Sequence, residues 1–283
     1  MENYLTKYAN KHSRFLALDG SLIHYRDEGR GEPMVLLHGA FSSLHTYNAW
    51  VEELKPYFRL IRLDLPGFGI SGSRTDQDYR IQNYVRIVGE VLDMLDVDSC
   101  HIVGSSLGGW ISWEFALKYP ERTKSLVLLD SAGFMDMDAI PLPFKMARTP
   151  FVNRVIKYVV RRGMLEQFVQ QVYYDQSKVT AELIERYHDL FTREGNPEAF
   201  LHLVNGKFRD NTRKLKYITA PTLIIWGEED QWIPVMFAYR FEMSIPDAAL
   251  IVYEHVGHVP MEEIPKMTAQ DILTFHGVAE VAV

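Results

Sequence analysis

The stretch "HIVGSSLGGW", from His101 to Trp110, places two adjacent serines in a glycine-rich turn. The apolar run "CHIVG" (100–104) before the serines predicts a buried strand. From Leu107 to Lys118 the apolar residues follow at spacings of three and four, which predicts an amphipathic helix. A serine on a sharp turn between a strand and a helix has its hydroxyl held clear of the sheet, where it can act as a nucleophile.

The glycines decide which of the two serines occupies that turn. The pattern G-x-S-x-G fits Gly104, Ser106 and Gly108. A side chain two positions before or after the nucleophile would collide with the crowded turn, so glycine is required there. A motif centred on Ser105 would put valine and leucine at these two positions. The pattern therefore predicts Ser106 as the nucleophile and Ser105 as its neighbour.

Outside this stretch, short apolar runs alternate with helical patterns, which predicts an α/β protein with a mostly parallel eight-stranded sheet flanked by helices. The turn Asp19-Gly20 predicts an opening hairpin. The expected strands are "RFLAL" (14–18), "LIHYR" (22–26), "MVLLH" (34–38), "FRLIRLD" (58–64), "CHIVG" (100–104), "SLVLLD" (125–130), "PTLIIWG" (221–227) and "ALIVYEH" (249–255). The expected flanking helices are Leu44–Leu54, Ile81–Leu95, Leu107–Lys118, Val235–Met243 and Ile264–Phe275.

The alternation of strands and helices stops after the sixth expected strand and resumes at Pro221. We therefore expect residues 132–219 to form a helical cap inserted into a core domain made of residues 1–131 and 220–283. The expected cap helices are Val152–Arg162, Leu165–Tyr174, Ala181–Phe191 and Pro197–Asn205.

A serine needs a base to remove its proton, and neutral histidine is the usual base near pH 7. "HVGHVPMEE" offers His258, in a loop after the last strand, and His255, which we place in the strand itself. The base in turn needs an acid to orient it. "WGEEDQWIP" supplies Asp230, with Glu228 and Glu229 expected as solvated neighbours, and Asp130 at the end of the sixth strand is the alternative.

Acyl transfer also requires donors for the negative oxygen that forms in the transition state. The N–H of Leu107, first in the helix after the nucleophile, is one expected donor. The second is expected in "LLHGAF", where Gly39 lets the chain turn beneath a substrate. There the N–H of Ala40 is the first choice and that of Phe41 the alternative.

Together these motifs resemble the capped α/β-hydrolases, which include esterases, lipases, haloperoxidase-like enzymes and carbon–carbon bond hydrolases. The matching elements are "LLHGAF", "DLPGFG" (64–69), "GSSLGG", "WGEEDQWIP" and "GHVPMEEIP", within a likeness that runs from about Arg14 to Phe275. The resemblance implies the α/β-hydrolase fold and a structural role for the turn at Asp64. Epoxide hydrolases and haloalkane dehalogenases of this fold use aspartate where this chain has Ser106, so neither activity is expected.

The resemblance also suggests substrate-binding candidates. Carbon–carbon hydrolases typically have asparagine before the nucleophile and tryptophan after the catalytic histidine, where this chain has Ser105 and Val259. Asn48 lies near a position where such enzymes keep a substrate-contacting asparagine, although it also suits the start of a helix. Phe41, beside the expected oxyanion donors, is a further candidate to contact substrate.

Composition narrows the class of protein. The formal net charge of −7 argues against nucleic-acid binding, and the single cysteine, Cys100, cannot form an intrachain disulfide. No secretory signal or long apolar span is evident, so a soluble cytoplasmic protein is expected. No zinc, dinucleotide or Walker motif occurs, so we predict no metal and no cofactor. The oligomeric state is left open.

One local feature has a different charge from the rest of the chain. Between residues 139 and 165 there are six basic residues and no acidic ones: Lys145, Arg148, Arg154, Lys157, Arg161 and Arg162. Segment 145–162 is expected to be a solvated cap face, with contact to a membrane or an anionic substrate as the alternative.

The sequence thus predicts a serine hydrolase that cleaves an ester, thioester or other activated acyl bond of a small apolar substrate. Carbon–carbon bond hydrolysis of a vinylogous diketone and perhydrolysis are the enzymatic alternatives. A non-catalytic binding or signalling role is the alternative from another class, and a full set of serine, histidine and aspartate argues against it.

Overall fold

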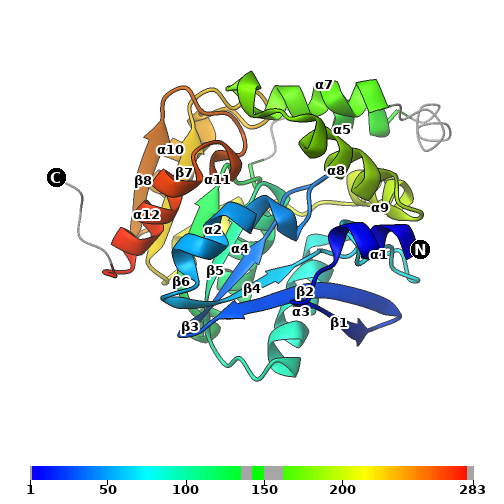
Figure 1. Ribbon diagram of the computed structural model, residues 1–283. Helices are drawn as coiled ribbons and strands as arrows, with labels where there is room; N and C mark the ends of the chain where they lie inside the picture. Colours follow the sequence, from blue (N-terminus) through cyan, green and yellow to red (C-terminus); the bar gives the residue numbers. More distant parts are fainter. Residues whose placement is uncertain (1, 135–141, 150–161, 279–283) are drawn as a thin grey trace.

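The computed structural model of the chain describes residues 2–134, 142–149 and 162–278, and Figure 1 shows their arrangement. An eight-stranded sheet crosses the molecule in the order β1-β2-β4-β3-β5-β6-β7-β8. The strands are β1 (Ser13–Leu18), β2 (Ser21–Gly29), β3 (Glu32–Leu37), β4 (Phe58–Leu63), β5 (Cys100–Ser105), β6 (Thr123–Leu129), β7 (Thr222–Gly227) and β8 (Ala248–Tyr253). Strand β2 is antiparallel to both neighbours, and all pairs from β4 to β8 are parallel. The predicted fold class is confirmed.

Helices cover the sheet and its carboxyl edge. Those described are α1 (Glu2–Tyr8), α2 (Asn48–Leu54), α3 (Ile81–Met94), α4 (Leu107–Lys118), α5 (Leu142–Ala147), α7 (Arg162–Val172), α8 (Ala181–Thr192), α9 (Asn196–Asn205), α10 (Met236–Ser244), α11 (Pro260–Glu263) and α12 (Pro265–Phe275). The expected helix Leu44–Leu54 consists of a 3-10 turn, Leu44–Tyr47, followed by α2.

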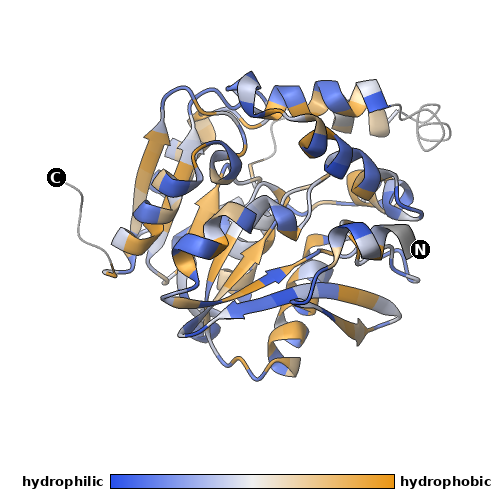
Figure 2. Ribbon diagram, viewed as in Figure 1, coloured by the Kyte–Doolittle hydropathy of each residue, from blue (hydrophilic) through white to orange (hydrophobic). Residues whose placement is uncertain are grey.

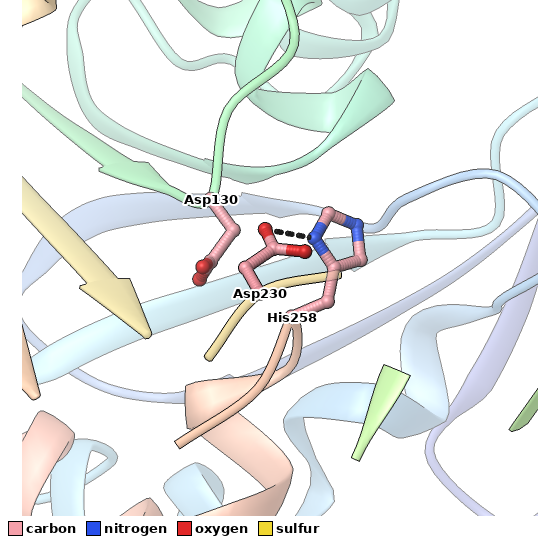
Figure 3. Close-up of side chains that lie close together, drawn as sticks. All are labelled: Asp130, Asp230 and His258. Carbon is pink, nitrogen blue, oxygen red and sulfur yellow. Dashed lines mark hydrogen bonds and ion pairs between the residues drawn. The ribbon is translucent and has the colours of Figure 1, made fainter. Parts of the chain in front are cut away.

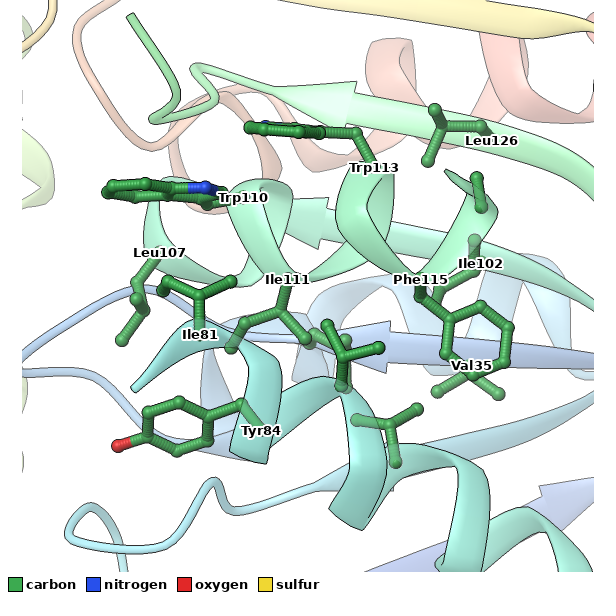
Figure 4. Packing of buried hydrophobic residues seen from close by; sticks show 14 of the residues in the cluster. Val35, Ile81, Tyr84, Ile102, Leu107, Trp110, Ile111, Trp113, Phe115 and Leu126 are labelled. Atoms are coloured by element: carbon green, nitrogen blue, oxygen red, sulfur yellow. The ribbon is translucent and has the colours of Figure 1, made fainter. Parts of the chain in front are cut away.

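Alternate residues of the central strands serve two separate hydrophobic cores, because successive side chains of a strand point to opposite faces. Val35 and Leu37 pack with α3, α4 and α10 on one face. Figure 4 shows part of this core, including Trp110, Ile111 and Trp113 of α4. Met34 and Leu36 pack with α2 and α12 on the other face. Figure 2 accordingly shows the central strands as mostly hydrophobic, the pattern of a sheet covered on both sides.

Helix α4 differs from its prediction. The sequence led us to expect an amphipathic helix, yet every residue from Leu107 to Ala116 is buried. The helix packs on β5 and β6 with one side and against α3 and the 3-10 turn Thr212–Tyr217 with others. Because α4 is covered all round, it holds the nucleophile turn from which it starts in a rigid frame.

Helices α5, α7, α8 and α9 lie between β6 and β7 in the chain, and all fall within the expected insertion, residues 132–219. Figure 1 shows them gathered over one edge of the sheet. Of the expected helix Val152–Arg162, only Arg162 is among the described residues, where it begins α7.

Helix α1 was not predicted, and it links the amino-terminal end to the inserted helices. The Tyr8 hydroxyl donates to Asp189 of α8 at 2.8 Å, and Lys7 pairs with the same carboxylate. On the core side, Arg26 of β2 donates to the Tyr8 carbonyl at 2.8 Å. In the sequence, the one sign of this helix is the four-residue separation of Tyr4 and Tyr8, which pack together in the structure.

Candidate active site

Ser106 occupies the turn between β5 and α4 with φ 53° and ψ −114°, a backbone conformation that L residues rarely adopt. The flanking glycines explain how the turn forms. A Cβ at Gly104 would lie 2.1 Å from the Gly108 carbonyl oxygen, and a Cβ at Gly108 would lie 2.1 Å from the Leu37 oxygen. No side chain fits at either glycine position. The residue in the strained conformation is therefore Ser106, the serine that the G-x-S-x-G pattern predicts as the nucleophile.

His258 and Asp230 form a buried pair on the loops after β8 and β7 (Figure 3). The distance between His258 Nδ1 and Asp230 Oδ2 is 2.7 Å. The other carboxylate oxygen of Asp230 accepts the backbone N–H groups of Trp232 and Ile233, at 2.7 and 3.0 Å. These bonds fix the carboxylate, which in turn fixes the imidazole with Nδ1–H as donor, and no described group bonds to Nε2.

Ser106 and His258 line the same pocket, although no hydrogen bond joins these two side chains. Such contacts are often long in the absence of substrate. The described geometry therefore brings the predicted serine, histidine and aspartate to one place, with the acid and base already bonded.

The alternative residues are placed differently. Asp130 lies beside Asp230 rather than at the imidazole nitrogen, as Figure 3 shows. The prediction that His255 belongs to the last strand is wrong, because β8 ends at Tyr253. His255 sits in the following turn at φ 60°, exposed to solvent and stacked on Tyr174 at 5.4 Å between ring centroids. Glu228 and Glu229 are exposed, as expected.

The loop after β3 lies directly against the nucleophile. A Cβ at Gly39 would be 3.0 Å from Ser106 Cβ, so only glycine lets the loop approach this closely. His38 anchors the loop: its Nδ1 donates to the Gly39 carbonyl at 2.7 Å and its Nε2 accepts the Leu65 N–H at 3.0 Å. Full burial lowers the pKa of His38, which agrees with this neutral tautomer.

Two backbone donors are available near Ser106. Within the described residues, the N–H groups of Ala40 and Leu107 donate to no protein acceptor. Ala40 lines the pocket, and Leu107 is the first residue of α4, where a helix leaves its N–H groups unpaired. Phe41, the alternative donor, follows Ala40 with φ 64°, so the loop bends sharply here.

The pocket holds about 480 Å³ of space between atoms, including its open side, and its described walls are mainly apolar. Its described lining residues are Gly39, Ala40, Phe41, Ser42, Thr46, Ser105, Ser106, Leu165, Phe168, Val169, Val172, Tyr187, Trp232, His258 and Val259. None of these is Lys, Arg, Asp or Glu. Two substrate-binding candidates, Phe41 and Ser105, therefore lie in the wall.

The third candidate, Asn48, does not line the pocket. It is exposed at the start of α2, and its Oδ1 accepts a hydrogen bond of 2.7 Å from Arg62, which is buried. Of the two roles considered for Asn48, the structure agrees with that of a polar residue at the start of a helix. Arg62 belongs to β4, so this hydrogen bond engages the Asn48 side chain with that strand.

Sequence reasoning missed the wall that the inserted helices supply. Leu165, Phe168, Val169 and Val172 of α7 recur at helical spacing, which predicts a buried face but does not reveal what it faces. The ring of Phe41 lies within 6.4 Å of aromatic rings from all four described inserted helices and of Trp232, measured between centroids. These aromatic contacts join the loop after β3 to the inserted helices.

Glu263 was also missed, and it connects the histidine loop to α7. Its carboxylate accepts the N–H of Gly257 at 2.6 Å and the N–H groups of Tyr174 and Asp175 at 3.0 Å each. The His258 N–H donates to the carbonyl of Val172 at 2.8 Å. Three hydrogen bonds thus join residues 257–263 to residues 172–175 at and after the end of α7, and a fourth, from Gly257 to Glu263, holds the histidine loop itself.

A family profile for the alpha/beta hydrolase fold matches residues 32–265, which include all the residues described in this pocket. The chain belongs to the alpha/beta hydrolase family. It is therefore a hydrolase.

The relatives in this family include several kinds of hydrolase. The chain is 30% identical over 85% of its length to 2-hydroxy-6-oxo-6-phenylhexa-2,4-dienoate hydrolase of Comamonas testosteroni, covering 86% of that protein. It is 30% identical over 89% of its length to the uncharacterized hydrolase YugF of Bacillus subtilis, covering 92% of it. Among solved structures, one described as a putative lipase from Acinetobacter baumannii superposes with a TM-score of 0.82 at 25% identity, covering 97% of this chain and 94% of that one.

Asp130, Asp230 and His258 are the one group among the described residues whose carboxylate and imidazole atoms could hold a metal, since one such atom from each lies within 4.8 Å of the others. The 2.7 Å bond from His258 to Asp230 already uses two of those atoms. A metal would have to break this bond to bind there, so the residues fit a hydrogen-bonded pair better than a metal site.

Two further expectations concern membranes. Among the residues that the structure describes, no helix combines the length and apolarity needed to cross a bilayer. Of the basic segment 145–162, Lys145, Arg148 and Arg162 are described, whereas Arg154, Lys157 and Arg161 lie outside the described residues. Contact of this segment with a membrane or an anionic substrate stays a prediction.

Proposed function

We propose that this hydrolase cleaves the ester bond of a small, uncharged, apolar substrate through an acyl-enzyme on Ser106. The observation that carries the proposal is the described pocket wall, which holds Ser106 and His258 but no Lys, Arg, Asp or Glu. Burying a substrate carboxylate against such a wall would cost free energy without a compensating ion pair. A neutral ester carries no such cost.

The proposed reaction begins with attack of Ser106 Oγ on the ester carbonyl carbon. His258 Nε2 takes the serine proton, and Asp230 stabilises the imidazolium through the Nδ1–H bond. The N–H groups of Ala40 and Leu107 donate to the oxyanion. His258 then returns the proton to the departing alcohol, which leaves the acyl group on Ser106.

Water completes the cycle. His258 removes a proton from a water molecule as that molecule attacks the acyl carbon, and returns the proton to Ser106 as the acid leaves. In this proposal α5, α7, α8 and α9 act as a cap that selects the acyl group, because α7 and α8 contribute Leu165, Phe168, Val169 and Tyr187 to the wall.

The second candidate is carbon–carbon bond hydrolysis, which the 30% identity to dienoate hydrolases favours. Ser105 and Val259, where such enzymes typically have asparagine and tryptophan, argue against it, and so does the lack of a cation in the described wall. A dienoate substrate carries a carboxylate that would need such a partner.

The deciding experiment compares kcat/KM for p-nitrophenyl esters of increasing acyl length with that for 2-hydroxy-6-oxo-6-phenylhexa-2,4-dienoate. We expect the best ester to exceed the dienoate and Ser106→Ala to remove ester hydrolysis by several orders of magnitude. If the dienoate were cleaved faster than every ester, carbon–carbon hydrolysis would replace the proposed function.

A further inference from the structure

Asp130 is a buried carboxyl group for which the proposed reaction has no use. It follows β6 directly, has no exposed surface and adopts φ 44°. Its backbone N–H donates to the Ile225 carbonyl at 3.1 Å, which keeps the residue at the end of the strand. An aspartate held in a strained conformation with its side chain fully buried needs compensating partners.

The two carboxyl oxygens of Asp130 differ in their hydrogen bonding. Its Oδ1 accepts the Gly227 N–H at 3.0 Å, but its Oδ2 is buried and receives no hydrogen bond. The neighbouring groups are the carboxylates of Asp230 and, farther away, Glu263, together with His258 beyond Asp230. Figure 3 shows the carboxyl of Asp130 beside that of Asp230. No cation among the described groups compensates a second buried negative charge at this place.

Burial, followed by repulsion from Asp230, raises the pKa of Asp130 well above its ordinary range. Asp230 differs because its Oδ1 accepts two backbone N–H groups and its Oδ2 accepts the imidazole N–H. Of the two adjacent carboxyls, Asp230 is the one supplied with donors, so the shared negative charge belongs there.

We infer that Asp130 is a neutral carboxylic acid whose Oδ2–H donates a hydrogen bond to the Asp230 carboxylate, making Asp130 a positioning residue for the His258–Asp230 pair. This inference rests on the proposed roles of Asp230 and His258. The donated bond gives Oδ2 of Asp130 a hydrogen-bond partner. It also holds the Asp230 carboxylate in the orientation that accepts from His258 Nδ1. The Asp130–Asp230 pair then carries one negative charge in total. This charge stabilises the His258 imidazolium while the proton stays on the histidine.

Protonation can be read directly, without turnover. The infrared difference spectrum at pH 7 between the wild-type protein and Asp130→Asn should show a carbonyl band of a protonated carboxyl group in the wild type. Glu114→Gln is the matched control, because Glu114 of α4 is a buried carboxyl outside the pocket wall that accepts a hydrogen bond from Asn211, just before the 3-10 turn Thr212–Tyr217. A difference spectrum that shows only ionised carboxylate bands would overturn the inference.

Kinetics test the positioning role. Removing a hydrogen bond to a charged group should lower kcat about ten- to hundredfold in Asp130→Leu. Asp130→Asn retains an N–H donor of similar shape and should recover most of that loss. Glu114→Gln should leave kcat at the wild-type value. Equal losses in the Leu and Asn variants would show that the charge of Asp130 matters, and wild-type activity in Asp130→Leu would show that it does not position Asp230; either result contradicts the inference.

A measurement on the unaltered protein covers the case in which the variants fail to fold. With 13C-labelled aspartate carboxyl groups, NMR at pH 7 should reveal one aspartate carbon with the chemical shift of a protonated carboxyl. Absence of such a signal would overturn the inference. If the signal is present but Ser106→Ala retains ester hydrolysis, the proposed function fails while the protonated Asp130 stands.

Discussion

Asp64 and Asp130 each follow a parallel strand of the same sheet, and neither has any exposed surface, yet their surroundings are opposite. Asp64 accepts three hydrogen bonds: from His24 Nδ1 at 2.7 Å, from the Leu44 N–H at 2.7 Å and from the Ile70 N–H at 2.9 Å. Asp130 accepts one, and its nearest charged neighbour is another carboxylate. The number of donors, rather than burial, separates the two.

The two carboxyl groups, both at the carboxyl edge of the sheet, have different roles. Burial alone would raise the pKa of Asp64, but the charge and hydrogen bond of His24 outweigh burial and hold that pKa well below its ordinary range. Its carboxylate joins β2, β4 and the turn that follows, which is a structural role. At the Asp130–Asp230 pair, by contrast, Asp230 accepts three hydrogen bonds and Asp130 accepts one.

The largest effect should come from Asp230→Asn. The amide can accept from Nδ1–H only through one oxygen and favours the wrong imidazole tautomer, so kcat should fall by about 10⁴. The amide N–H₂ would also face at least one of the three N–H groups that now donate to Asp230, so the melting temperature should fall by a few degrees. Steady-state ester hydrolysis and thermal unfolding measure the two quantities. A loss of less than tenfold would mean that Asp130, not Asp230, serves His258.

Asp64→Asn should show the reverse pattern, with a loss of stability rather than of kcat. Its amide N–H₂ would face backbone donors, and breaking such a buried network should lower the free energy of unfolding by about 3 kcal/mol at pH 7. A carboxyl whose pKa is lowered by folding stabilises the folded state at pH values above its unfolded pKa of about 3.9. This stabilisation is lost as the pH falls toward the pKa of the folded state.

Urea unfolding of wild type and Asp64→Asn between pH 7 and pH 2 measures that dependence. The stability difference between the two proteins should therefore shrink as the pH falls below about 4. A difference that is constant with pH would show that Asp64 does not carry a stabilising charge.

Glu263→Gln tests the connection between the histidine loop and α7. The amide nitrogen would oppose at least one of the three N–H groups that now point at the carboxylate. We expect the free energy of unfolding to fall by about 2 kcal/mol and kcat to fall on the order of tenfold, since His258 would be less well placed. If stability fell while kcat stayed unchanged, the hydrogen bonds of Glu263 would have a structural role only.

Asn48→Ala should have the smallest effect. It removes the bond to Arg62, worth about 1 kcal/mol, while Arg62 keeps its pairing with Glu28. The KM and kcat for esters should stay within about twofold of wild type because the side chain is outside the pocket wall. A tenfold rise in KM would indicate that Asn48 contacts the substrate.

The sequence predicted best where local sterics leave one solution. The glycines around Ser106 exclude every other register, and strand ends place His258 and Asp230 at one edge of a parallel sheet. It failed where tertiary packing decides. Asn48 bonds Arg62 of β4 and does not line the pocket, and the neighbours of α4 bury its polar positions. No local pattern shows that α7 faces Ser106 or that Glu263 reaches Gly257.

The most direct test of the central claim is to label the folded protein with a fluorophosphonate and map the modified peptide by mass spectrometry. The strained turn, the adjacent free N–H donors and the buried His258–Asp230 pair predict one covalent adduct, on Ser106, which Ser106→Ala abolishes and Ser105→Ala preserves. Absence of labelling in folded protein, or an adduct on Ser105, would contradict the account.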